Sequence, residues 1–389
     1  MSGQAVLPHA EPPARAQRAR NVLLATVGLS VVVGLFFSGF SSEFGNPEPH
    51  NIPIAVVGTP SVRATLNASP ALSVRSAADA TIATRMVLDR TVYGAIEFTG
   101  PRSVELLVAN GGGHSADVAL TAIATAFAQS RGAKVQVVEL APTTPNDPNG
   151  TVEFYCIVFL VIGAALGANV LGQLLGPIRN LRDMGHRLII LLLYTSVAAL
   201  TVTFLGDIVY GALVGQFGLL FLTLWAYTFS IAVAVAGVVA LFGGAAGLLL
   251  TLTLVILGNT SAGGPVSRPL SGRFFSAINP YFPQGAGLSI VRGVQYFGGR
   301  GIAESVWCLA TWTAGGLAFL TIHAVRVGRG QEDARDIGVT VNAASLNATA
   351  QSDDPAADDP AADDPAADDP AADDPTNEVD DAHVLVLHD

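Results

Sequence analysis

The chain has 389 residues, of which 50% are hydrophobic and 13% charged, and its mean hydropathy is +0.48. This composition excludes an ordinary soluble domain and indicates an integral membrane protein. The formal net charge of -11 comes from the last part of the chain, because the segment 331–389 contains 17 acidic residues and one arginine. Lys134 is the only lysine and no Gly-Lys pair occurs, so the chain lacks the phosphate-binding loop of an ATPase.

The first 20 residues are polar and carry Arg15, Arg18 and Arg20 directly before an apolar run. That run is longer than the roughly 7–15 residues of a signal-peptide core, and it lacks an Ala-x-Ala cleavage site. We therefore predict a cytoplasmic N-terminal tail (1–20) and an uncleaved signal anchor (21–41) as the first transmembrane helix.

The segment 45–152 differs in kind, because strand-like runs alternate with helical patterns. Such alternation predicts a small α/β domain, placed outside the cytoplasm by the preceding anchor. His114, Ser115 and Asp117 are expected to cap its second helix. The glycine triplet 111–113 lacks the further glycine and the lysine of a phosphate loop and is interpreted as a tight turn. The expected strands are 52–58, 93–98, 104–109 and 134–140, and the expected helices are 76–92 and 114–130.

The region 153–326 is predicted to contain five more transmembrane helices, because its apolar runs approach the roughly 20 residues that a spanning helix needs. Six crossings from a cytoplasmic N-terminus place the loop 176–187 and the C-terminus in the cytoplasm, which agrees with most of the arginine distribution. Cys156 and Cys308 are interpreted as buried thiols, with a disulfide between them as the alternative. The expected spans are 154–175, 188–205, 219–242, 245–262 and 305–325.

The loop 263–304 is too interrupted to span and too apolar for an ordinary loop. Its part 273–299 predicts two short amphipathic helices, the second with a polar stripe of Ser289, Arg292 and Gln295. We expect a re-entrant pair between spans five and six that keeps Arg292 near water. The alternative is a loop lying on the membrane surface. The residues expected to form a re-entrant gate are Phe274, Phe275, Asn279, Pro280, Pro283, Arg292 and Tyr296.

The end of the chain repeats DDPAA between residues 353 and 375. Proline at every fifth position prevents a helix and the aspartates repel one another, so a disordered acidic cytoplasmic tail is predicted for 327–389. A solvated tail is the preferred interpretation, and a docking segment for a basic partner is the alternative.

The chain resembles ABC-2-type transporter permeases, in the branch of the YhgE/Pip (phage infection protein) homologues. The resemblance covers the layout of about 45–325. It is carried by IPIAVVG (52–58), VYGAIEF (92–98) and SRPLSGRFFSAINPYFPQGAGLSIVRGVQYFGG (267–299). It implies a homo- or heterodimeric permease in the bacterial cell membrane, driven by a separate ABC ATPase subunit. The cytoplasmic loop would then contact that ATPase through Pro177, Arg179, Asn180, Arg182 and Asp183.

The resulting hypothesis is a six-helix export permease for an amphipathic or lipid-like substrate, with the lipid bilayer and an ATPase as partners. The alternative is a membrane-anchored scaffold or receptor that binds a partner through its extracytoplasmic domain. We expect no enzymatic activity, cofactor, metal or nucleic-acid partner, because no catalytic or ligand constellation is recognisable. No carboxylate falls in the middle of a span, which argues against a proton-coupled carrier.

Overall fold

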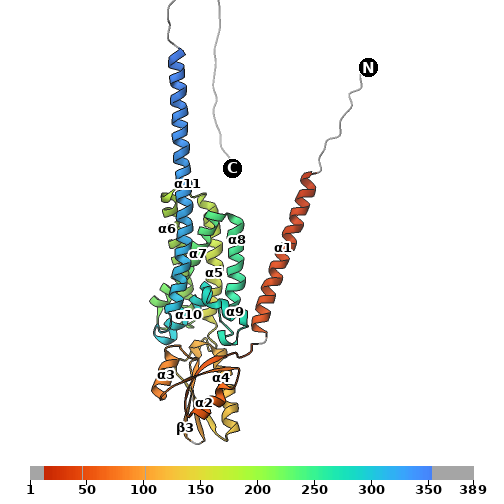
Figure 1. The fold of residues 1–389 in the computed structure, drawn as a ribbon, viewed down its shortest axis with the longest axis vertical. Coiled ribbons are helices and arrows are strands. Elements are labelled where there is room, and N and C mark those ends of the chain that lie inside the picture. The colour runs from red at the N-terminus through yellow and green to blue at the C-terminus, as the bar shows by residue number, and fades with distance from the viewer. Residues whose placement is uncertain (1–12, 46, 101, 353–389) are drawn as a thin grey trace, which may run out of the picture. The chain divides into compact units, whose positions relative to one another are not determined.

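The structure, a computed structural model, describes residues 13–45, 47–100 and 102–352 (Figure 1). The chain divides into two compact units, residues 1–332 and 333–389, and helix α11 (Ala303–Ser352) begins in the first and ends in the second. This helix replaces the part 327–352 of the expected disordered tail, because the sequence contains no proline between the last span and Pro355 to stop it, and the rest of that tail, 353–389, lies outside the described residues. The repeats of 353–375 lie outside the described residues.

Among the described residues, five helices are long and apolar enough to cross a membrane, which supports a multi-pass membrane protein. The expected span 245–262 instead forms the shorter pair α8 (Gly244–Thr253) and η3 (Leu254–Gly258), the latter a π-helical turn. Six full-length spans are therefore not confirmed. The first helix also begins earlier than expected, inside the predicted polar tail. The long helices are α1 (Pro13–Phe44), α5 (Val152–Leu175), α6 (Leu181–Phe204) with η2 (Leu205–Val209), α7 (Phe217–Phe242) and α11.

The predicted α/β domain contains a five-stranded sheet in the order β2-β1-β3-β4-β5, in which only β3 and β4 pair antiparallel. The four expected strands and two expected helices are present. β2 and α2 escaped prediction, because both are short and β2 is defined mainly by its pairing with β1. The elements are β1 (Ile52–Val57), α2 (Pro60–Asn67), β2 (Leu72–Ser76), α3 (Ala80–Leu88), β3 (Gly94–Gly100), β4 (Ser103–Val108), η1 (Asn110–Gly112), α4 (His114–Ser130) and β5 (Lys134–Glu139).

Alternation along the strands gives the sheet two apolar faces. On one face, Ile52, Ile54 and Val56 of β1 pack with α2 and α4. On the other, Ala55 belongs to a cluster that contains α3 residues and also Phe297, the last residue of α10 (Pro283–Phe297). A helix of the membrane region therefore completes the core of the α/β domain.

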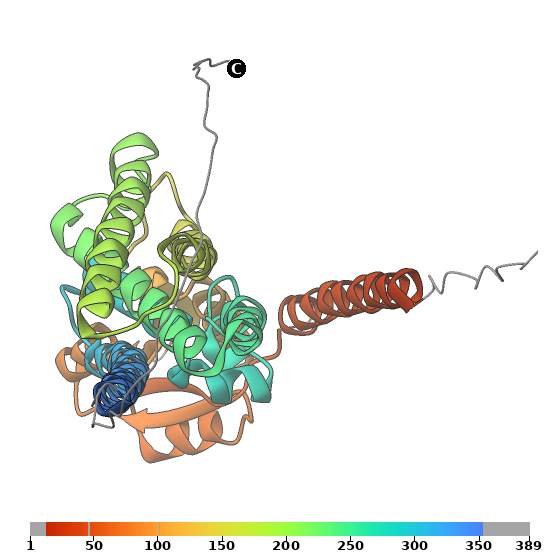
Figure 2. The ribbon, with the colours of Figure 1, turned by 90° about the horizontal axis from the view of Figure 1, so that it is seen from above.

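The helices of the membrane region pack around α7, which contacts α5, α6, α8 and α10 (Figure 2). α11 comes close to α7 at two glycines: a Cβ built on Gly237 would lie 2.4 Å from the carbonyl oxygen of Gly316. Backbones can approach this closely in lipid because glycine has no side chain.

The loop 263–304 contains both expected short helices, α9 (Arg273–Ile278) and α10, joined through the 3-10 turn η5 (Asn279–Tyr281). α10 is buried along nearly its whole length and packs against α5 and α7. The re-entrant position of this pair in a membrane stays a prediction. Arg292, which was expected near water, is only 5% exposed and borders a polar cavity inside the protein. In the polar stripe of α10, Ser289 contacts Arg90 of the α/β domain and Arg292 contacts the turn at Gly263.

Candidate functional site

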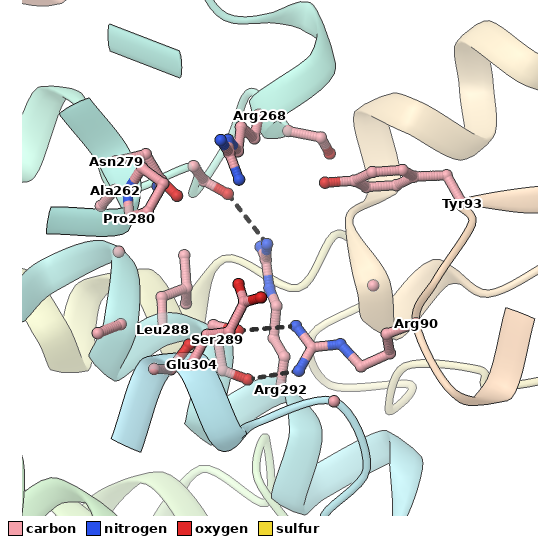
Figure 3. A pocket seen from close by; sticks show the side chains of 17 residues that line it. Arg90, Tyr93, Ala262, Arg268, Asn279, Pro280, Leu288, Ser289, Arg292 and Glu304 are labelled. Atoms are coloured by element: carbon pink, nitrogen blue, oxygen red, sulfur yellow. Dashed lines mark hydrogen bonds between the residues drawn. The ribbon is translucent and has the colours of Figure 1, made fainter. Parts of the chain in front are cut away.

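A polar cavity of about 230 Å³, here called the junction cavity, lies where the α/β domain meets α10 and the start of α11 (Figure 3). Three arginines from three separate elements line it. Arg90 follows α3, Arg268 begins the 3-10 turn η4 (Arg268–Leu270), and Arg292 belongs to α10. The remaining polar side chains of the lining are Tyr93, Ser267, Asn279, Ser289, Glu304 and Ser305.

Arg292 is the most buried of the three arginines. Its Nη1 donates to the carbonyl of Gly263 at 3.0 Å, and its Nη2 donates to the carbonyls of Gly264 and Gly150 at 3.1 and 3.4 Å. Glu153 is close enough to interact electrostatically with Arg292, but the two form no ion pair. Because carbonyl groups carry no net charge, they do not neutralise the buried guanidinium, and Arg292 contributes a positive electrostatic potential to its surroundings.

Arg90 has a backbone conformation that side chains other than glycine rarely adopt, with φ at 59°. Glycine adopts this backbone conformation after a helix more readily than arginine does, but only the arginine side chain can make the contacts described next. Nη1 donates to the carbonyl of Ser289 at 2.8 Å, and the guanidinium lies 5.3 Å from the ring centroid of Phe297. Burial lowers the pKa of Arg90 to about 10, which still leaves it charged at neutral pH.

The third arginine, Arg268, is exposed and donates from Nε to the carbonyl of Ser276. Tyr93 points into the cavity from the opposite side (Figure 3). Burial raises the pKa of Tyr93, while the charges of Arg90, Arg268 and Arg292 oppose that rise. All three arginines therefore act electrostatically on one phenol.

The glycine triplet 111–113 forms the expected tight turn, since Gly111 and Gly112 belong to the 3-10 turn η1, and it is also packed closely against other segments. A Cβ on Gly111 would lie 2.3 Å from the ring of Tyr296, and one on Gly113 would lie 2.2 Å from the hydroxyl of Ser267. The residues expected to cap α4 do not do so, since no side chain caps that helix. Ser115 hydrogen-bonds to Ser267 at 2.9 Å, and Asp117, in the first turn of α4, is buried.

The structure brings some of the expected gate residues together and separates others. Asn279, Pro280 and Arg292 line the junction cavity, and Asn279 also donates to the carbonyl of Ser261. Tyr296 donates to Glu153 at 2.5 Å, beside the glycine triplet. Pro283 begins the buried helix α10, whereas Phe274 is exposed on α9 and stacks edge-on with its neighbour Phe275.

The expected coupling loop joins the end of α5 to the start of α6. Asn180 caps α6 by accepting from the Asp183 backbone N–H at 2.9 Å, and Asp183 accepts from the Arg179 backbone N–H at 3.1 Å. Arg187 ties the loop back to α5 through the carbonyls of Gly172 and Gly176. Pro177, Arg179 and Arg182 are exposed.

Sequence reasoning missed Arg90, Tyr93 and Arg268. Arg268 lies within the resembling stretch 267–299, but nothing local distinguishes Arg90 from a surface arginine. Within the described residues, no group of three or more His, Cys, Asp or Glu side chains could hold a metal ion. Both cysteines are free thiols, with Cys156 buried.

Comparison with known proteins identifies no relative: no family model, curated protein or solved structure matches this chain.

Proposed function

We propose that the protein is the membrane subunit of an exporter of the ABC-2 type, similar to the YhgE/Pip branch, which moves an amphipathic or lipid-like substrate. In this proposal a separate ATPase supplies the energy, and two permease subunits form the working unit. The α/β domain follows the first span and lies outside the cytoplasm. The short pair α8–η3 makes a sixth crossing, so that both chain ends lie in the cytoplasm.

The position of α10 is the observation that carries the proposal. This helix packs on α5 and α7 in the membrane region, supplies Phe297 to the core of the α/β domain, and borders the junction cavity. A movement of α5 or α7 would therefore reach the cavity and the domain together. Rigid-body movement of packed helices is the usual way in which such coupling is transmitted.

The loop between α5 and α6 provides a surface for the ATPase. Its fold depends on Asn180, Asp183 and Arg187, whereas the side chains of Arg179 and Arg182 make no hydrogen bond or ion pair among the described residues. These two exposed charges are therefore available to a partner without being needed for the loop.

A double variant, Arg179→Gln with Arg182→Gln, tests this proposal. We expect an ATPase that co-purifies with the intact protein in detergent to be lost from the variant. The charge-matched control is Arg75→Gln with Arg102→Gln, two exposed arginines of the α/β domain, which should retain it. Equal recovery of the ATPase by both double variants would contradict the assignment of the loop.

One observation favours the second candidate function, a membrane-anchored scaffold or receptor. Val118 of α4 and Val137 of the edge strand β5 are about half exposed and line a shared groove on the α/β domain. An edge strand with exposed apolar side chains is suited to partner binding. If the domain tethered by an unrelated anchor restored the cellular function, the scaffold would replace the exporter.

A further inference from the structure

We propose that the junction cavity binds the phosphate-bearing headgroup of an anionic amphiphile. This inference names the substrate class of the proposed exporter and in that respect rests on it, but binding itself requires neither an ATPase nor transport.

The charge of the cavity points to an anion. Arg90, Arg268 and Arg292 line it against one carboxylate, that of Glu304. Among the described residues the only ion pair joins Arg300 to Asp89, so none of the three arginines is neutralised by a carboxylate in contact. Positive groups gathered in a partly enclosed space attract and hold negative ligands more strongly than the same groups on open surface.

The donors that remain unused point to phosphate. The Nη groups of Arg268 have no hydrogen-bond partner within the described part of the chain, nor has Nε of Arg292 or of Arg90. These planar groups approach from three elements (Figure 3). A tetrahedral phosphate presents acceptor oxygens in several directions, and guanidinium groups match it well. The volume of about 230 Å³ is several times that of a water molecule, about 30 Å³.

The surroundings point to an amphiphile rather than a free ion. Exposed Tyr and Trp side chains occupy the helix ends nearest the α/β domain: Tyr155 lies in the first turn of α5, Tyr210 follows η2, Tyr281 precedes α10 and Trp307 lies in the first turns of α11. Tyr and Trp concentrate at the headgroup level of membranes. Trp307 is 73% exposed, two residues beyond the cavity-lining Ser305. A headgroup in the cavity would thus have an apolar surface beside it for its tail.

The test measures binding to the full-length protein, purified in an uncharged detergent, by isothermal titration calorimetry. The probes are a short-chain phosphatidic acid, inorganic phosphate, and the short-chain diacylglycerol with the same tails. We expect the phosphatidic acid to bind most tightly. Weaker binding of both inorganic phosphate and diacylglycerol would show that headgroup and tail contribute together.

Arg268→Gln is the test variant, because Arg268 is exposed and its loss leaves the buried contacts of Arg292 intact. We expect Arg268→Gln to weaken the binding of phosphatidic acid about tenfold, since hydrogen bonds between charged groups are stronger than those between neutral groups. Arg75→Gln removes the same charge from an exposed position on β2 and should bind like the parent. Matching unfolding temperatures of the two variants confirm that the fold is kept.

Three results would overturn the proposal. The first is equal affinity for phosphatidic acid and diacylglycerol, and the second is equal affinity of Arg268→Gln and Arg75→Gln. The third is equal affinity for inorganic phosphate and phosphatidic acid, which would assign the cavity to a free ion. Loss of the exporter proposal is a separate outcome, because it is decided by the ATPase with the Arg179 and Arg182 variants.

Discussion

Both Nη groups of Arg90 in the α/β domain hydrogen-bond to Ser289 of α10, although the two residues are 199 positions apart in the chain. Nη1 donates to the Ser289 carbonyl at 2.8 Å and Nη2 donates to its hydroxyl at 3.1 Å. This contact joins the soluble-type domain to a helix buried among the apolar helices. It also fixes one wall of the junction cavity.

We expect Arg90→Ala to lower the stability of the junction. A hydrogen bond to a charged group contributes about 1.5–3 kcal/mol. In a double-mutant cycle with Ser289→Ala, which removes only the hydroxyl bond, the two changes should be less than additive. The measurement is thermal unfolding in detergent, with Arg85→Ala on α3 as an exposed control. Strict additivity would show that the hydroxyl bond contributes nothing.

Arg90→Gly separates the side chain from the backbone. It removes the same hydrogen bonds as Arg90→Ala but suits a φ of 59°. A residue with a Cβ in this region is disfavoured by about 1–2 kcal/mol relative to glycine. We therefore expect Arg90→Gly to unfold at a higher temperature than Arg90→Ala. An equal unfolding temperature would mean that the backbone at Arg90 relaxes when the side chain is removed.

Gly111→Ala should disrupt the docking of the α/β domain on α10, because the added Cβ would lie 2.3 Å from the Tyr296 ring. Overpacking of this kind destabilises by about 1–3 kcal/mol. The matched control is Gly112→Ala, whose Cβ would meet the Phe297 ring at an ordinary 3.4 Å. Limited proteolysis and thermal unfolding should both distinguish the two variants, and identical behaviour would contradict the close contact.

Asp117 predicts a stability that depends on pH. Burial and the nearby charge of Glu139 raise the pKa of its carboxyl to about 8, from an ordinary value of 3.8. The folded state therefore binds more protons than the unfolded state between these values, and stability falls as pH rises from about 4 to about 8. Asp117→Asn removes this dependence, so its advantage over the parent should grow as the pH rises from 5 to 9.

Unfolding temperatures of Asp117→Asn and the parent across this pH range provide the measurement. Glu105→Gln on β4 is the control, and it should leave the pH dependence of the parent unchanged. A constant difference between Asp117→Asn and the parent at every pH would show that the carboxyl is ionised in the folded domain.

Gly316→Ala should separate α11 from α7. The added Cβ would lie 2.7 Å from backbone atoms of Ala234, which cannot rotate away. Gly315→Ala is the control one residue earlier, since no heavy atom lies within 4 Å of its Cβ. We expect the first variant to be less stable by about 1–3 kcal/mol and the second to be unchanged or slightly stabilised, as judged by unfolding in detergent.

Elements that depend on neighbouring residues could be predicted from the sequence. Apolar runs of sufficient length predicted six spans, of which five form helices long and apolar enough to cross a membrane within the described part of the chain. Alternation predicted the strands around Ile54 and Leu106. The cap of α6 by Asn180 is likewise local, although the sequence suggested a partner-binding role for that residue instead. Such features follow from hydrogen bonding and hydrophobic periodicity over a few residues.

Contacts between segments that are distant in the chain could be learned only from the folded structure. The convergence of Arg90, Arg268 and Arg292 joins residues from three distant segments, and the burial of α10 depends on the space that α5 and α7 leave for it. The glycines at 111 and 316 look alike in sequence to many others, yet each is required by a neighbour far along the chain. Packing selects among contacts that local sequence leaves equivalent, because close approach depends on shapes from both partners.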